Sequence, residues 1–413
     1  MSMRKYFSDE YQSLWIAVSA VVLFLYALFL YFDLGEELYK ASKGLAAYEW
    51  RRYLGISKRF LLQWGHMVFL FVLLVASKYV FHYDRHLLIP RRVLQVLTLY
   101  SVAVFMFHFP LLYFFAAVTG HDPHSYADQA RLLGLVLVAS VLLGRACLAL
   151  APAFERTKNL ILRLYRTRVL RHYRRPAPVP FDFEDGRFYA ITESHSNVLD
   201  VVKLVATAAV VLGHFSFREF SDWNFLGFDG SAPRFAVPAF FMMSGYFAMM
   251  SIDRKADTAP EIIFKRYWSL YYLVVPMVIL TPILDHVGFR VDPAVYRHNE
   301  LFVSADGTGG PAGPVEFLYT FVNSVLYLNE VWIYNLLGLR AEIGGMRTFS
   351  NDAFWFMCYL MPFSVLLAVG ARLRGLRRAA VLAALCLFFG PPMLLLFPLF
   401  LAGALAYGIH KHW

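Results

Sequence analysis

Long apolar runs occupy most of this chain and leave little sequence for a soluble domain. A helix needs about 20 apolar residues to span the hydrocarbon core of a bilayer. Hydrophobic residues make up 59% of the chain and charged residues 16%, as in polytopic helical membrane proteins. We therefore predict an all-α transmembrane bundle of about ten spans. The expected spans lie near 14–33, 63–83, 95–118, 131–152, 197–217, 233–252, 266–289, 353–371, 377–391 and 393–409.

The basic residues predict how the bundle lies in the membrane. The segment "ERTKNLILRLYRTRVLRHYRRP" and the shorter loops "DRHLLIPRR", "DRKADTAPEIIFKR" and "ARLRGLRR" are all rich in lysine and arginine. Short basic loops stay in the cytoplasm, and alternation puts these four on one side with both termini. Most of the net charge of +10 then comes from loops that orient the protein in the membrane, so we expect no nucleic-acid partner. The loop at 34–62 is a basic exception outside, which suggests an interfacial helix.

Three parts follow from this order of spans. Residues 1–152 hold four helices, 153–196 form a basic cytoplasmic linker, and 197–413 hold six helices with an extracytoplasmic loop at 290–352. The linker opens as a basic amphipathic helix suited to anionic lipid headgroups. The aromatic second part of the loop predicts an interfacial or re-entrant helix. The turn Gly390-Pro391-Pro392 separates the last two short runs.

One span carries polar groups that a bilayer disfavours. In "DVVKLVATAAVVLGHFSF", the side chains of Asp200, Lys203, Thr207 and His214 share one face at about 100° per residue. Two interpretations stay open. In the first, Asp200 and Lys203 extend from the helix end toward the membrane surface, and His214 is a core histidine with its hydrogen bonds made. In the second, all four side chains line a cavity. Ionisable groups inside spans usually mark a site.

Other spans add candidates for the same cavity. Ser101 and His108 lie seven residues apart on one helix face, and the ring of Pro110 frees a backbone carbonyl nearby. Arg145 is a mid-span arginine and a site candidate for that reason. The three cysteines, Cys147, Cys358 and Cys386, lack metal-binding spacing, so we expect no metal site.

Several motifs together resemble the membrane acyltransferase-3 family. "LDVVKLVATAAVVLGHFSF" is similar to the family's first helix, L-D-x-x-R-x-x-A…H, with Lys203 in place of arginine. "VPAFFMMSGYFA" resembles its second helix and "IIFKRYWSLYYLVVP" the start of its third. "DAFWFMCYLMPFSVLL" and "FPLFLAGALAYGI" are similar to two later helices.

The family's last helices resemble segments that come first in this chain. "YSVAVFMFHFPLLYFF" resembles the family's H-x-P helix. "LVLVASVLLGRACLALAPAFERTKN" resembles the closing E-R-P helix, with Glu155-Arg156 matching and Thr157 in place of proline. The resemblance therefore indicates a circular permutation in which 153–196 joins the family's two ends.

The resemblance implies an activity and a location. Members transfer an acyl group, usually acetyl from cytoplasmic acetyl-CoA, to a hydroxyl of an extracytoplasmic polysaccharide, oligosaccharide or glycolipid. Acetyl-CoA is then a donor substrate and not a resident cofactor. A multi-pass protein of the bacterial cytoplasmic (inner) membrane, working with envelope polysaccharide machinery, is the corresponding expectation.

The resemblance also assigns roles to residues. It implies a catalytic group of His214, Asp200 and Ser244, with His214 as general base. Lys203, Lys265 and Arg266 would bind the phosphates of the donor. Ser101, His108 and Thr207 would line the cavity, and Arg145, which has no counterpart in the family pattern, is added to them as a mid-span arginine. Alternatives remain open: Lys265 and Arg266 also suit positive-inside anchors, and Ser244-Gly245 suits close helix packing.

Departures from the family pattern keep other functions open. Ser269 stands where members often have a second arginine, and Leu360 and Met361 stand where some have glutamates. One alternative is therefore a catalytically degenerate scaffold of an envelope-assembly complex. Another is a transporter or flippase, although the chain lacks the inverted repeat that many transporters use.

Overall fold

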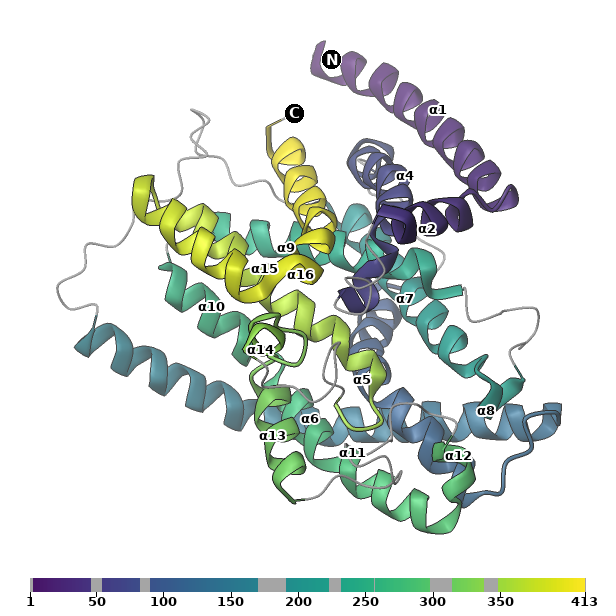
Figure 1. The fold of residues 1–413 in the computed structure, drawn as a ribbon. Coiled ribbons are helices and arrows are strands. Elements are labelled where there is room, and N and C mark those ends of the chain that lie inside the picture. The colour runs from purple at the N-terminus through teal and green to yellow at the C-terminus, as the bar shows by residue number, and fades with distance from the viewer. Residues whose placement is uncertain are drawn as a thin grey trace.

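The computed structural model describes residues 3–45, 54–81, 90–169, 191–222, 232–255, 257–297, 314–337 and 348–412. Nearly all of this part is helical, and its only β-pairing is an isolated bridge between Thr348 and Asn351. Nine helices within it are long and apolar enough to cross a membrane. The predicted all-α bundle is confirmed (Figure 1).

Long helices and short helical turns succeed one another along the chain. They are α1 (Met3–Tyr31), α2 (Leu34–Leu45), η1 (Gly55–Arg59), α4 (Phe60–Val80), α5 (Arg91–Val118), α6 (Tyr126–Arg168), α7 (Glu193–Phe215), α8 (Arg218–Ser221), η3 (Ala232–Phe235), α9 (Ala236–Arg254), α10 (Ala259–Trp268), α11 (Tyr271–Val291), α12 (Pro293–Arg297), α13 (Pro314–Val325), α14 (Ile333–Leu336), η4 (Asp352–Phe354), α15 (Trp355–Arg372) and α16 (Gly375–His412).

One end of the bundle collects many of the helix ends. The start of α7 meets the end of α4 through a 2.8 Å hydrogen bond between His195 Nε2 and Ser77 Oγ. The end of α16 meets the end of α9 through Lys411 and Asp253 at 2.8 Å. Arg372, the last residue of α15, donates to carbonyl groups at the end of α9. We name this end of the bundle the basic end. In Figure 1 the N and C labels both lie at the top of the view.

Helix α16 reverses direction at Gly390. The φ and ψ angles there are 76° and −179°, a backbone region open essentially to glycine alone. A Cβ atom on Gly390 would also lie 2.2 Å from Trp332. Helix α16 begins three residues after Arg372, which contacts the end of α9, and Lys411 near its last residue also contacts α9, so both ends of α16 lie at the basic end. The nine spans count α16 once. Its two limbs correspond to the short runs expected at 377–391 and 393–409.

The centre of the bundle is formed by α15, and its edge by α1. In the most apolar part of α15, 83% of the residues are buried, against 11% for α1. Helix α5 connects the two halves of the chain, because it packs on α6 and also on α7 and α11. Residues from both halves therefore form one hydrophobic core, which places the candidate site between them.

Helices α9 and α16 approach each other unusually closely. A Cβ atom on Gly245 would lie 1.9 Å from the carbonyl oxygen of Phe400, and one on Gly403 would lie 1.7 Å from that of Met242. Each glycine therefore lies against the backbone of the other helix. This contact supports the packing role that the sequence left open for the Ser244-Gly245 pair.

The expected connecting segments are described only in part. The span expected at 131–152 continues as one helix, α6, to Arg168, so the linker begins as an extension of that span. Residues 170–190 of the linker, and 298–313 and 338–347 of the 290–352 loop, lie outside the described residues. Short helices occur where interfacial segments were expected, namely α2 after α1 and α13 in the loop.

Candidate functional site

His108 and His214 meet in the interior, between α5 and α7. His108 Nε2 and His214 Nδ1 are 2.8 Å apart, and the two rings are nearly parallel, with centroids 5.1 Å apart. His108 is fully buried, whereas His214 as a residue is partly exposed. The rings of Phe109 and Phe217 pack against the His214 ring, with centroid distances of 4.8 and 5.6 Å. Within the described residues, His214 Nε2 makes no hydrogen bond, so that atom can meet a substrate.

Pro110 shapes the part of α5 that carries His108. Proline has no amide hydrogen, so the carbonyl group four residues earlier, that of Met106, loses its helical partner. Asn351 Nδ2 donates to this oxygen at 2.9 Å. The sequence predicted a freed carbonyl at this position, and the structure identifies both the carbonyl and the donor. Asn351 is 1% exposed, so the loop before α15 holds α5 from inside the core.

Lys203 and Asp200 form an ion pair nearer the basic end. Their side-chain atoms are 2.9 Å apart, and Lys203 Nζ lies 4.4 Å from the centre of the Phe247 ring. Thr207 is buried and donates to the backbone oxygen of Lys203 at 2.9 Å. Asp200 is fourteen residues from His214, about 21 Å along α7 at 1.5 Å per residue. The structure therefore separates Asp200 from the histidine pair.

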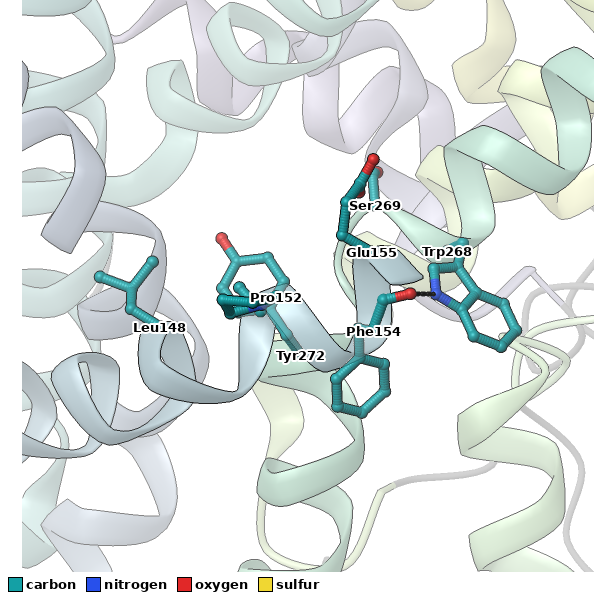
Figure 2. Close-up of a pocket in the computed structure, with 8 residues that line it drawn as sticks. Leu148, Pro152, Phe154, Glu155, Trp268, Ser269 and Tyr272 are labelled. Carbon is teal, nitrogen blue, oxygen red and sulfur yellow. Dashed lines mark hydrogen bonds between the residues drawn. The ribbon is translucent and has the colours of Figure 1, made fainter. Parts of the chain in front are cut away.

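A pocket of about 360 Å³ lies between α6 and the junction of α10 with α11 (Figure 2). Trp268 Nε1 donates to the Phe154 oxygen at 2.7 Å and ties the two helices together. Ser269, which stands where the family often has arginine, faces this pocket together with Glu155. The lining residues are Leu148, Ala151, Pro152, Phe154, Glu155, Trp268, Ser269 and Tyr272.

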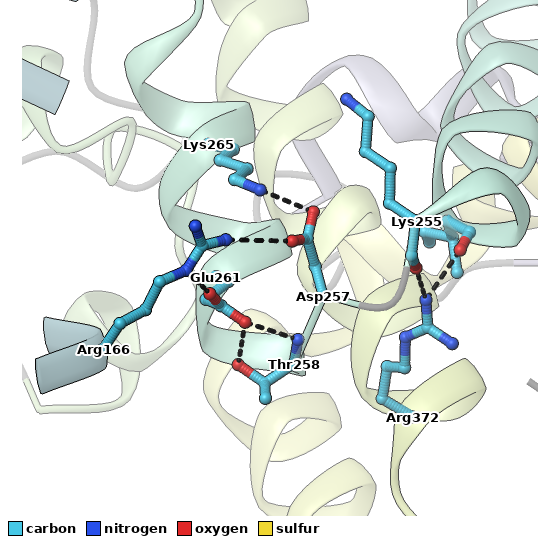
Figure 3. Close-up of polar contacts among 8 residues, drawn as sticks. Arg166, Lys255, Asp257, Thr258, Glu261, Lys265 and Arg372 are labelled. Carbon is cyan, nitrogen blue, oxygen red and sulfur yellow. Dashed lines mark hydrogen bonds and ion pairs between the residues drawn. The ribbon is translucent and has the colours of Figure 1, made fainter. Parts of the chain in front are cut away.

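Lys265 belongs to an ionic network at the basic end (Figure 3). Its ammonium group lies 2.6 Å from Asp257. Arg166, near the end of α6, contacts Glu261 at 2.6 Å and Asp257 at 3.4 Å. Both carboxylates are largely buried. The charge of Lys265 is therefore already compensated in this structure.

Arg266 differs from its neighbour Lys265. Its Nε atom is buried without a hydrogen-bond partner among the described residues. Burial lowers the pKa of the Arg266 guanidinium, but arginine remains charged in proteins. Of the three cations expected to hold the donor, Arg266 is therefore the one that the described residues leave without a carboxylate partner. An anionic ligand would supply one.

Neither Ser101 nor Ser244 makes a hydrogen bond to the histidine pair. Ser101 is buried and donates to the Thr98 oxygen of its own helix at 2.8 Å. Ser244 is partly exposed on α9 and has no hydrogen bond to a described residue.

The expectation that Arg145 lines an interior cavity is not met. The residue is exposed on α6. Gly144 packs against Ala103, and Cys147 is buried. At about 100° per residue, position 145 then turns away from the bundle.

Sequence reasoning missed Arg166, Asp257, Glu261 and Asn351. One local signal was available: Thr258-Ala-Pro-Glu261 has the spacing of a capping box, and the box is formed at the start of α10. Nothing local indicated that Arg166 reaches this box from α6, or that Asn351 reaches α5. Both contacts join segments more than 90 residues apart.

The fold defines a polytopic helical membrane protein, and a pair of hydrogen-bonded histidines lies in its interior. Residues 197–413 match the model of a family described as an acyltransferase domain. The chain belongs to this family and is a membrane acyltransferase by that membership. Searches of curated proteins and of solved structures gave no match.

Proposed function

We propose that this protein is an O-acyltransferase that moves an acyl group, most often acetyl, from acyl-CoA to a hydroxyl of an extracytoplasmic glycan or glycolipid. The observation that carries the proposal is the partly exposed His214 with its Nε2 atom open, one residue before the end of α7. An imidazole nitrogen that is accessible and unprotonated is a general base for a hydroxyl group.

The chemical step needs only this base and the two substrates. His214 Nε2 takes the proton of the acceptor hydroxyl as its oxygen attacks the thioester carbonyl. The carbon–sulfur bond then breaks, and the leaving thiolate of coenzyme A takes a proton from the imidazolium. The acyl group ends on the acceptor oxygen, and His214 returns to its neutral form.

The position of the charged groups supports a donor that enters at the basic end. Lys203 lies eleven residues from His214, about 16 Å along α7. The pantetheine arm of coenzyme A has a comparable extended length. The phosphates of the acyl-CoA donor would then lie near Arg266, while its thioester reaches His214. Because lysine and arginine favour cytoplasmic loops, we assign the basic end to the cytoplasm of a bacterial inner membrane.

The packing of the first four spans supports the permutation inferred from the motifs. Helix α5, which resembles the family's H-x-P helix, packs against α7, which resembles the family's first helix. Arg166 near the end of α6 contacts α10 at the basic end, where α7 also begins. The 153–196 linker would then join two ends on one side of the membrane.

A transfer assay tests the proposal. Purified protein in detergent is incubated with radiolabelled acetyl-CoA and candidate glycan or glycolipid acceptors. We expect label in the acceptor and release of free coenzyme A. Binding of the glycan without transfer from any acyl-CoA would instead favour the degenerate scaffold suggested by Ser269, Leu360 and Met361. Movement of the acceptor across vesicles without acylation would favour a transporter.

Arg266→Ala should weaken acyl-CoA binding more than Lys265→Ala does. A hydrogen bond to a charged group contributes about 1.5–3 kcal/mol, so we expect a loss of roughly tenfold or more. Lys265 is compensated by Asp257, so its loss should matter less. The measurement is calorimetric titration with coenzyme A at several salt concentrations, because screening weakens exposed charge pairs.

Arg374 provides a matched control for this prediction. It is an exposed arginine just after α15, at the same end of the bundle. Arg374→Ala should leave the affinity for coenzyme A unchanged. Equal affinities of wild type, Arg266→Ala and Lys265→Ala for coenzyme A would contradict donor binding by these cations. Their role would then be only to orient the protein in the membrane.

A further inference from the structure

The partner of His214 comes from outside the part of the chain that matches the family model. The match covers residues 197–413, whereas His108 lies in α5. The separation of the two ring centroids, 5.1 Å, is close to two imidazole radii added to the 2.8 Å nitrogen–nitrogen distance. The two nitrogens therefore lie on the line between the ring centres. The contact is an in-plane hydrogen bond and not a stack of ring faces.

The surroundings of His108 determine where its hydrogen lies. His108 Nδ1 is 3.0 Å from the Val104 oxygen and 2.9 Å from the Phe105 oxygen. Carbonyl oxygens only accept hydrogen bonds, so Nδ1 carries the hydrogen and donates it. In the neutral ring, Nε2 of His108 is then an acceptor. His214 must therefore donate from Nδ1.

The tautomer of His214 follows from that hydrogen bond. With its hydrogen on Nδ1, the neutral ring of His214 has its lone pair on Nε2. Nε2 has no hydrogen-bond partner among the described residues and is not one of the buried unpaired atoms, so this nitrogen is accessible, whereas Nδ1 is bonded to His108. The opposite tautomer would leave a hydrogen on the open nitrogen, which could not then accept one from a hydroxyl group.

We propose that His108 is a positioning residue that holds His214 in the orientation and tautomer needed by a general base. This inference rests on the proposed function, in which His214 takes the hydroxyl proton. When Nε2 gains that proton, Nδ1–H of His214 remains bonded to His108 Nε2. His108 thus has the place that an orienting carboxylate has in a catalytic triad, but without a negative charge.

The fold keeps His108 from moving. Its ring is 0% exposed and is held by two carbonyl groups of its own helix. Asn351 holds the same turn of α5 through the Met106 oxygen. The base and its orienting group therefore come from the two halves of the chain, and the family-matched segment contains only the first. The site is complete only when α5 is in place.

The test compares three substitutions at one position. His108→Leu removes the acceptor, and we expect kcat to fall about 10²-fold, the size of effect that misplacement of a catalytic group by about 1 Å produces. The KM for acetyl-CoA should change little, because His108 is far from the basic end. His108→Gln places an amide oxygen near the former Nε2 and should recover about tenfold of that loss. His108→Ala should be rescued in part by added imidazole.

A buried histidine elsewhere is the matched control. His66 in α4 is 2% exposed, and its Nδ1 atom is hydrogen-bonded to the Tyr26 hydroxyl at 2.7 Å. His66→Gln should leave kcat unchanged, which separates a role at the site from the general loss of a buried ring. Thermal unfolding of every variant in detergent shows whether it is folded.

The outcomes separate this inference from the proposed function. Wild-type kcat in folded His108→Leu, with inactive His214→Gln, would overturn the positioning role and leave the base in place. Full activity in both variants would overturn the proposed function itself. If His108→Leu does not fold, the Ala variant decides: restoration of kcat by imidazole supports the positioning role, and its absence in folded protein contradicts it.

Discussion

His214→Gln should remove most acyl transfer while the protein stays folded and still binds acyl-CoA. General base catalysis contributes about 10²–10⁴-fold, so kcat should fall by at least that range. Glutamine retains hydrogen bonding but cannot take a proton, so His214→Gln should do no better than His214→Ala. The measurement is label transfer from acetyl-CoA in a purified sample, together with a titration of coenzyme A binding.

A structural role for His214 predicts a different pattern. Its ring packs against Phe109 and Phe217. If packing were its only role, the substitution by glutamine would lower activity only by destabilising the fold. Activity would then follow the unfolding temperature across variants. A stable His214→Gln protein with wild-type transfer would exclude the general-base role.

Gly245→Ala should prevent normal assembly of the bundle. The new methyl group would lie 1.9 Å from the Phe400 carbonyl oxygen, and a backbone atom cannot move aside as a flexible side chain can. Overpacking a core typically costs about 1–3 kcal/mol, and a clash with backbone should reach or exceed the upper value. We expect a low yield of monodisperse protein and a clearly lowered unfolding temperature in detergent.

Gly408 in α16 is the matched control for this effect. A Cβ atom there would have nothing within 4 Å. Alanine is favoured over glycine in a helix by roughly 0.5–1 kcal/mol, so Gly408→Ala should be neutral or slightly stabilising. Equal stability of Gly245→Ala and wild type would show that α9 and α16 separate without cost.

Much of the fold follows from local patterns. Apolar runs predict the spans because backbone polar groups in lipid must be satisfied within a helix. The turn at Gly390 was also predictable, since glycine followed by two prolines cannot continue a helix. The extension of α6 to Arg168 was harder to place, because a basic amphipathic segment fits either a separate interfacial helix or the end of a long span.

The candidate site was predictable only in its residue types. A histidine and a lysine on one face of a span signal a site by their cost in lipid, and that argument singled out His214 and Lys203. The same argument selected Arg145, which the structure places on the outer surface of α6. Cost alone does not say which way a side chain faces. That depends on the rotation of the helix against its neighbours.

The sequence by itself determined the class of protein, the position of the spans, and His214 as the residue to test. Tertiary structure decided the partners of two residues: His108 for His214 and Asp257 for Lys265. The pair of Asp200 and Lys203 is local, three residues apart, but the histidine pair joins residues 106 positions apart. Hydrogen bonds act over about 3 Å, whereas helical periodicity describes only one segment at a time. Packing of α5 on α7 therefore had to be known before the tautomer of His214 could be assigned.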